Sequence, residues 1–272
     1  MNSARITGLW IYPVKSCQGI SVTEMKIGPA GPLHDREWLI VDEQNKFITL
    51  RTQPRLAEIK TALQDSFLQL YLGPNKIIID LNAPSEARDQ VTIWNDSVEA
   101  GVCSHDINEA ISDFLNQSVK LVRYDQKSFR ELKAAGTSEV NQTRFTDSRP
   151  VLLTNKNSLD ELNRLILKQG GAGATINRFR SNIIIDGLEA FAEDQIKEIH
   201  FGEVKLQNAK PCSRCVIITQ DVESGHVVSK ETLKTLANFR REQGAKVTFG
   251  TYFTPGQLGR VRVGEISRHI LT

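Results

Sequence analysis

Two cysteines stand close together in the segment KPCSRCVIITQD, which runs from Lys210 to Asp221. Cys212 and Cys215 are separated by a serine and an arginine, and Lys210 precedes them. Neighbouring cations favour the thiolate form of cysteine, which attacks electrophiles and binds soft metal ions. The segment therefore indicates an activated thiolate, and its spacing leaves the use of that thiolate open.

Three other interpretations of this pair have less support. A redox pair of the thioredoxin type lies at a helix N-terminus, whereas the β-branched residues after Cys215 predict a strand. A structural zinc site needs four nitrogen or sulfur ligands, and the other cysteines, Cys17 and Cys103, stand alone. A buried, unreactive state is ordinary for a free thiol, and it fits those two cysteines better than this pair.

Basic and amide side chains also occur where predicted strands begin or end. They belong to the segments YPVKSC, LHDREW and INRFRSNIII and are Lys15, Ser16, Arg36, Arg178, Arg180 and Asn182. Taken one at a time, such residues are usually just solvated. Together they would suit an anionic ligand, because guanidinium groups bind phosphate through paired hydrogen bonds and lysine adds a point charge. Whether they converge depends on the fold.

The elements that must position these residues are mostly strands. In the first part of the chain, β-branched and aromatic residues between turn residues predict strands over 5–13, 20–28, 36–43, 46–52, 67–73, 76–81, 91–95 and 97–102. One helix is predicted over 105–117, since its apolar residues recur at helical spacing. A polar connector over 124–146 suggests a soft domain boundary.

The second part mixes strands with two further helices. Strands are predicted over 151–154, 182–186, 198–202, 203–207, 215–220, 226–229, 246–253 and 259–264, and helices over 157–170 and 231–242. Ser158 and Glu161 predict a capping box at the start of the first of these helices. Strands and helices do not alternate one for one, so we expect a β-rich α+β fold and no doubly wound sheet.

Composition excludes several classes of function. The 272 residues contain 34 Lys and Arg against 32 Asp and Glu, so the net charge of +2 favours neither nucleic acid nor an anionic membrane as partner. The sequence has neither a run long enough for a membrane span nor a secretory signal. Four scattered cysteines fit a reducing compartment, and we expect a cytoplasmic protein.

Five blocks of the sequence, taken in order, resemble the MOSC-domain family, which is named after the C-terminal domain of molybdenum cofactor sulfurases. The blocks are YPVKSCQGI, LHDREWLIVD, RTQPRLAEI, FRSNIIID and CSRCVIIT. The resemblance covers essentially the whole chain and is closest to the amidoxime-reducing component branch and its bacterial relatives. It implies a MOSC N-terminal β-barrel-like domain over 1–122, followed over 123–272 by a MOSC β-barrel domain with a few peripheral helices.

The same resemblance implies a molybdenum-molybdopterin cofactor. It assigns Cys215 as the metal ligand and catalytic residue. We expect a packing or supporting role for Cys212, because a second thiolate would fill the position that the substrate needs. A soft thiolate suits such a metal, and neighbouring side chains orient the ligand. The residues implied to bind the cofactor are Lys15, Ser16, Arg36, Asp147, Ser148, Arg180, Asn182, Ser213 and Arg214.

The implied activity is reduction of small N-hydroxylated compounds, namely amidoximes, hydroxylamines and N-hydroxylated nucleobases. The cofactor carries out the redox chemistry, and the electrons are expected from a separate ferredoxin or flavin reductase. Two alternatives stay open at this point. A persulfide on Cys215 could make the protein a sulfur carrier, or the chain could store or deliver the cofactor without catalysis.

Overall fold

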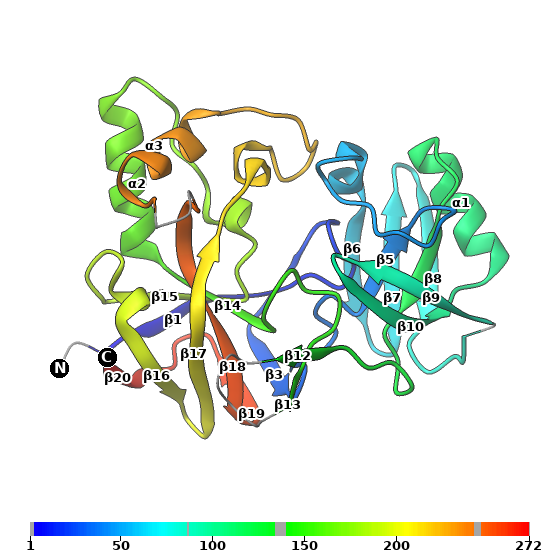
Figure 1. Cartoon of the computed structure of the whole chain (residues 1–272), viewed down its shortest axis with the longest axis horizontal. Coiled ribbons are helices and arrows are strands. Elements are labelled where there is room, and N and C mark those ends of the chain that lie inside the picture. Colours follow the sequence, from blue (N-terminus) through cyan, green and yellow to red (C-terminus); the bar gives the residue numbers. More distant parts are fainter. Residues whose placement is uncertain (1–2, 86, 134–139, 242–245, 272) are drawn as a thin grey trace.

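The computed structural model describes residues 3–85, 87–133, 140–241 and 246–271, and it has two lobes (Figure 1). One lobe contains a large curved sheet with the helices α2 (Lys156–Lys168) and α3 (Glu231–Phe239), and the other contains smaller sheets with α1 (His105–Leu115). Strands dominate both lobes. The predicted β-rich α+β class is therefore confirmed.

The large sheet has eight strands in the order β2-β1-β15-β14-β18-β17-β16-β20. In chain order they are β1 (Arg5–Ile11), β2 (Ile20–Val22), β14 (Val151–Asn155), β15 (Ile183–Asp186), β16 (Ile196–Phe201), β17 (Val204–Ser213), β18 (Thr248–Gln257) and β20 (Ser267–Leu271). Neighbours are antiparallel except β14 and β15, which are parallel. The first strands of the chain thus complete a sheet built mainly from its second half.

The other lobe is built from a four-stranded and a three-stranded sheet. The first has the order β5 (Trp38–Val41), β11 (Lys120–Arg123), β10 (Asp96–Val102) and β9 (Ala87–Ile93), and the second has the order β6 (Lys60–Gln64), β7 (Phe67–Leu72) and β8 (Asn75–Asp80). Two small sheets complete the fold, one of β19 (Gly259–Arg262), β3 (Glu24–Gly28) and β4 (Gly31–Pro32), the other of β12 (Glu131–Lys133) and β13 (Val140–Gln142).

Alternation along β5 shows how the sequence distributes residues between two cores. Trp38 and Ile40 pack with α1 and β7 in one apolar cluster, whereas Leu39 and Val41 pack with β9 and β10 in another. Successive strand residues point to opposite faces, so a strand buried on both faces reads as a continuous apolar run. Burial of each such side chain stabilises the folded state by about 1.5–3 kcal/mol.

The three predicted helices are confirmed, but the predicted capping box is wrong. Asn155 is the N-cap of α2, and its side chain accepts a hydrogen bond from the Asn157 backbone N–H. Ser158 lies one turn further on, is fully buried, and donates to Glu193 Oε2 at 2.8 Å. Its hydroxyl is therefore committed to a tertiary contact rather than to the helix end.

Three predicted strands are also wrong. Residues 215–220 form a 3₁₀ turn, Val216–Thr219, rather than a strand. Residues 46–52 and 226–229 make only isolated bridges or turns. Ile218 is buried in the cluster beneath α2 and α3, and the Thr219 hydroxyl donates to the Val216 carbonyl at 2.6 Å. Tertiary packing and a local hydrogen bond thus override the β propensity of this segment.

The division of the chain after residue 122 stays a prediction. Strands from both sides of that position share the eight-stranded sheet, because β1 pairs with β15. None of the helices in the described ranges combines the length and the apolar character that crossing a lipid bilayer requires.

Gly250 permits a bulge in β18 beside the cysteine segment. β17 pairs Pro211 with Thr251 and Ser213 with Thr248, so β18 has one extra residue between these pairs. Gly250 has a φ of 71°, and a Cβ there would lie 2.6 Å from Thr154 Cγ2 and 2.8 Å from the Leu153 carbonyl oxygen. A side chain at this bulge would be both strained and crowded.

We predict that Gly250→Ala lowers the free energy of unfolding, measured by urea denaturation, by about 2 kcal/mol or more. Gly202→Ala is the matched control, because Gly202 has a φ of 54° but nothing within 4 Å of the added Cβ. The control should lose about 1 kcal/mol from backbone strain alone. Equal losses would show that crowding at the bulge has no effect.

Glu193 makes stability depend on pH. Burial raises the pKa of its carboxyl from 4.5 to about 7, although the Ser158 hydrogen bond opposes this shift. The unfolded chain then ionises at lower pH than the folded chain, so we predict that the free energy of unfolding falls as pH rises from about 4.5 to 7. Urea titrations at pH 5 and pH 8 test this. Glu193→Gln should reduce the difference between them, and an unchanged difference would contradict the assignment.

Candidate active site

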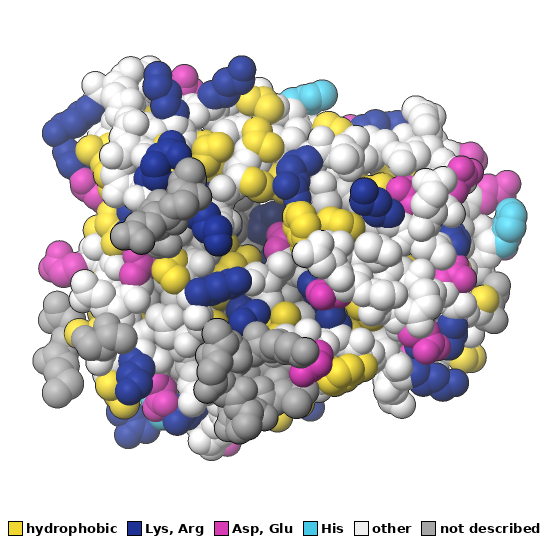
Figure 2. Space-filling view, viewed as in Figure 1, with side chains coloured by type: hydrophobic (Ala, Val, Ile, Leu, Met, Phe, Trp, Pro, Cys, Tyr) yellow, Lys and Arg dark blue, Asp and Glu magenta, His cyan; other side chains and the backbone are white. Residues whose placement is uncertain are grey.

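A cavity of about 210 Å³ lies where residues from both lobes meet, and it collects the predicted site residues. Figure 2 shows the hollow near the centre of one face, with Lys and Arg side chains around it and hydrophobic side chains at its edge. Every predicted site residue except Ser148 lines this cavity. The prediction of a contact at Ser148 therefore rests on the resemblance alone.

The two cysteines of the opening segment differ in accessibility. Cys215 is half-buried, has an extended backbone and directly precedes the 3₁₀ turn Val216–Thr219. Cys212 is buried in β17, and burial raises the pKa of its thiol even though the charge of Arg214 opposes this effect. The expectation that nearby cations activate the thiol is therefore wrong for Cys212. The burial of Cys212 is consistent with a packing role. Cys215 is the more accessible of the two thiols and is therefore better placed to bind a metal ion.

Arg214 is fixed beside Cys215 by backbone carbonyls. Its Nε donates to the Phe249 carbonyl at 2.9 Å, and its Nη1 donates to the Phe179 carbonyl at 3.0 Å. The Phe249 carbonyl belongs to the bulged part of β18, so the bulge helps to place the guanidinium. The neighbouring Ser213 is exposed and also lines the cavity.

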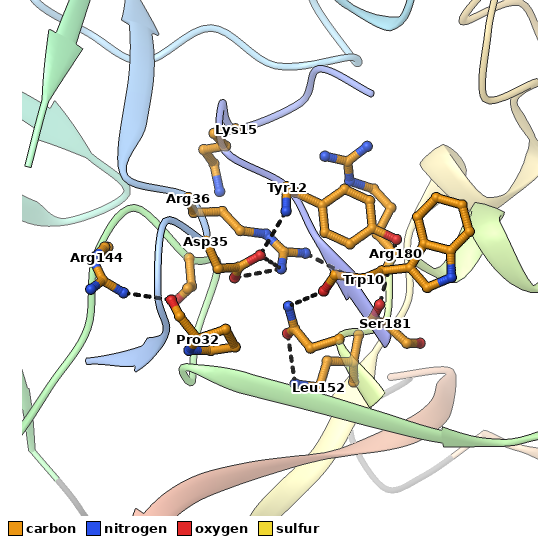
Figure 3. A network of polar contacts seen from close by, with 12 residues as sticks. Trp10, Tyr12, Lys15, Pro32, Asp35, Arg36, Arg144, Leu152, Arg180 and Ser181 are labelled. Atoms are coloured by element: carbon orange, nitrogen blue, oxygen red, sulfur yellow. Dashed lines mark hydrogen bonds and ion pairs between the residues drawn. The ribbon is translucent and has the colours of Figure 1, made fainter. Parts of the chain in front are cut away.

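Two further guanidinium groups meet at the Tyr12 ring. The guanidinium carbons of Arg36 and Arg180 each lie 4.3 Å from the ring centroid. Asp35 holds Arg36 through bonds of 2.7 and 2.8 Å, and Arg36 Nη2 donates to the Arg180 carbonyl at 2.9 Å (Figure 3). Burial lowers the pKa of Arg180, and the charge of Arg36 acts in the same direction, whereas Tyr12 opposes it.

The buried Lys15 forms an ion pair with Asp147, whose side chain is exposed. Lys15 donates to the Phe145 carbonyl at 3.0 Å and to the Asp147 carboxylate. Desolvation raises the pKa of Asp147, but the charge and hydrogen bond of Lys15 outweigh this and bring the pKa to about 2. Asp147 is therefore ionised at neutral pH. It can accept hydrogen bonds there, but it cannot donate a proton.

Three of the site residues have left-handed backbones. The φ angles are 72° at Ser16, 46° at Arg36 and 54° at Arg180. Such conformations are uncommon outside glycine and persist only where the surrounding structure imposes them. They concentrate here at the turns that carry the cavity-lining side chains. Asn182 instead supports the strands: its amide accepts from the Leu152 N–H at 3.1 Å and donates to the Trp10 carbonyl at 3.2 Å.

The lining also contains residues that the sequence patterns did not single out. They include Arg51, Trp94, Arg149 and Tyr252. Arg51 is the first residue of RTQPRLAEI, one of the five blocks that resemble the MOSC-domain family. The resemblance therefore already pointed to the segment that contains Arg51. Trp94 belongs to the strand predicted over 91–95, whereas in the structure it directly follows β9 in the turn before β10. The predicted strand therefore contained no signal for a site residue at this position.

The donor set of the cavity fits an anionic ligand. In the described part of the lining there is one carboxylate, Asp147, against the cations Lys15, Arg36, Arg51, Arg149, Arg178, Arg180 and Arg214. One nitrogen each of Arg178, Arg180 and Arg214 is buried without a hydrogen-bond partner. Unpaired buried donors are costly, and a phosphate or pterin oxygen would satisfy them. The cavity thus fits the phosphorylated pterin that the resemblance implies.

No three His, Cys, Asp or Glu side chains among the described residues lie close enough together to hold a metal ion. Within the lining, the soft donors are the thiols of Cys212 and Cys215. Of these two thiols, Cys215 is the more accessible.

Comparison with known proteins identifies the family. A family model of the MOSC N-terminal beta barrel domain matches residues 3–118, and one of the MOSC domain matches residues 141–266. Mitochondrial amidoxime-reducing component 1 of Mus musculus is 32% identical, covering 96% of this chain and 80% of the relative. The Homo sapiens protein of the same name is 30% identical, with 96% and 81% covered.

A molybdenum cofactor sulfurase from Danio rerio is 29% identical over 92% of this chain, but the match spans only 32% of that protein. The similarity that spans most of both chains is thus to the amidoxime-reducing components, in agreement with the five sequence blocks. The chain belongs to the MOSC-domain family, in the branch that contains the amidoxime-reducing components.

Proposed function

We propose that this protein is a molybdenum-cofactor-dependent oxidoreductase that reduces small N-hydroxylated compounds, such as amidoximes, hydroxylamines and N-hydroxylated nucleobases. The observation that carries the proposal is the cavity in which half-buried Cys215 lies among arginines with unpaired buried nitrogen atoms. The relatives support it, since they are named amidoxime-reducing components and a molybdenum cofactor sulfurase.

The proposed roles of the side chains follow from their surroundings. Cys215 would supply the protein thiolate to molybdenum, with Ser213 and Arg214 beside it. Lys15, Arg36 and Arg180 would hold the phosphate group of the pterin cofactor, because charge-assisted hydrogen bonds are strongest in poorly solvated sites. Ser16, Asp147, Ser148 and Asn182 are proposed as further cofactor contacts. When bound, the cofactor supplies the two-electron chemistry that removes oxygen from an N–O bond.

The chain itself contributes positioning and electrostatics. Arg214 and Arg36 are already fixed by carbonyl or carboxylate partners, so they need little reorganisation when an anion binds. Asp147 is ionised and keeps Lys15 in place. We propose that electrons come from a separate ferredoxin or flavin reductase and that the protein acts in the cytoplasm.

We predict that Cys215→Ala abolishes both bound molybdenum and reduction of benzamidoxime, because the variant lacks the metal ligand. Metal analysis measures the first effect, and an assay with chemically reduced viologen as electron donor measures the second without a protein partner. Cys212→Ala is the matched control and should retain much of both. Its thiol is buried, with Sγ 3.7 Å from the Ser213 carbonyl oxygen.

Two results would contradict this assignment. Equal losses in the two variants would mean that Cys215 is not the specific ligand. A cyanide-labile sulfur on Cys215 in wild-type protein that contains no molybdenum or pterin would instead identify a sulfur carrier.

We also predict that Arg180→Ala weakens cofactor binding by about tenfold or more, because a hydrogen bond to a charged group is worth about 1.5–3 kcal/mol. Molybdenum and pterin per chain are the measurements. Arg164→Ala serves as control, since Arg164 lies on the surface of α2 and pairs with Glu161 at 2.6 Å. Full occupancy in Arg180→Ala would remove this residue from the site. Arg36→Ala should also lose cofactor, but it removes the ion-pair partner of the buried Asp35 as well.

A further inference from the structure

Trp94 lies at the tip of the β9–β10 hairpin and lines the same cavity as Cys215. Its side chain is 40% exposed, whereas Trp38 is fully buried. The lining beside Cys215 comes mainly from the lobe with the eight-stranded sheet, and Trp94 reaches the cavity from the other lobe. An accessible indole at the wall of a site offers a flat apolar surface to a ligand.

The hairpin tip is held firmly in place. Trp94 has a φ of 56°, a strained conformation for a bulky residue that the neighbouring contacts must maintain. Ile93, which precedes it, is fully buried. Asp96, which follows closely, accepts from Arg130 Nε at 2.8 Å, and Arg130 Nη1 donates to the Thr146 carbonyl at 2.7 Å. Thr146 adjoins Asp147, so the tip is tied to the opposite wall of the cavity.

The indole also has defined neighbours. The Phe47 ring lies 4.9 Å from it, centroid to centroid, at an angle of 58°. The Arg51 guanidinium carbon lies 5.0 Å from the indole centroid, and Arg51 lines the cavity as well. Trp94 and Arg51 together form what we call the Trp94 rim. Its position is set before any ligand arrives, which lowers the entropic cost of binding.

We propose that the Trp94 rim is a stacking site for the planar part of the substrate. It selects conjugated N-hydroxylated compounds, such as aryl amidoximes and N-hydroxylated nucleobases, over aliphatic ones. Stacking of a planar base on an aromatic side chain strengthens binding by about tenfold or more. This inference rests on the proposed function, because it concerns the substrate of the same cavity. Trp94 is thus a specificity-determining residue contributed by the N-terminal half of the chain.

The test compares benzamidoxime with acetamidoxime, using reduced viologen as electron donor. In Trp94→Ala the ratio of kcat/KM for benzamidoxime to that for acetamidoxime should fall about tenfold or more, chiefly through a higher KM for benzamidoxime. Trp94→Phe should retain most of the wild-type ratio. Phe67→Ala is the matched control, since Phe67 is also an aromatic residue with 40% exposure in this lobe but lies outside the cavity lining. It should leave the ratio unchanged.

A second readout needs no turnover. Benzamidoxime titrated into wild-type protein without a donor should quench tryptophan fluorescence to saturation, and Trp94→Phe should lose that quenching. An unchanged ratio in Trp94→Ala would overturn the proposal. If that variant also lost molybdenum or pterin, so that activity toward both compounds fell by the same factor, Trp94 would contact the cofactor instead.

The two readouts separate the stacking site from the reductase activity. If wild-type protein reduces neither compound, the proposed function fails. Saturable quenching that depends on Trp94 would still support the stacking site in that case, and absence of quenching would overturn it.

Discussion

The guanidinium groups of Arg36 and Arg180 both lie 4.3 Å from the centre of the Tyr12 ring, although like charges in a poorly solvated site repel each other. The fold offsets this repulsion locally. The aromatic face attracts both cations, the Asp35 carboxylate neutralises one of them, and the Arg180 carbonyl accepts a hydrogen bond from Arg36. Without such compensation the cations would separate into solvent, and the cavity would lose the positive field that suits an anionic ligand.

Holding these charges constrains the backbone. Ser16, Arg36 and Arg180 are in left-handed conformations, and β18 bulges at Gly250 next to the carbonyl that anchors Arg214. Each departure from regular geometry costs free energy that the surrounding core must supply. The eight-stranded sheet meets this need, because Tyr12 directly follows β1, which pairs with both β2 and β15. The N-terminal strand is therefore part of the framework of the site as well as part of the sheet.

The site lies between parts of the chain that are distant in sequence. Cys215 and Arg214 come from the end of β17, Lys15 and Arg36 from early turns, and Trp94 from the hairpin of the other lobe. Sites between structural units can combine rigid walls with access for a ligand. In this protein one wall provides most of the charge and a thiol, whereas the other provides the Trp94 rim, with its aromatic surface and Arg51. This division separates the proposed binding of the cofactor from the proposed selection of the substrate.

The sequence by itself determined the strand-rich class, the three helices and the motif blocks of the family, because these depend on local periodicity and residue type. It also named most of the cavity-lining cations. Only the tertiary structure decided that these cations converge, that Cys215 is more accessible than Cys212, and that Trp94 joins them. It likewise replaced the strand predicted after Cys215 with a 3₁₀ turn and gave Ser158 a partner in Glu193. These outcomes depend on contacts between residues far apart in the chain, and local propensity carries no information about such contacts.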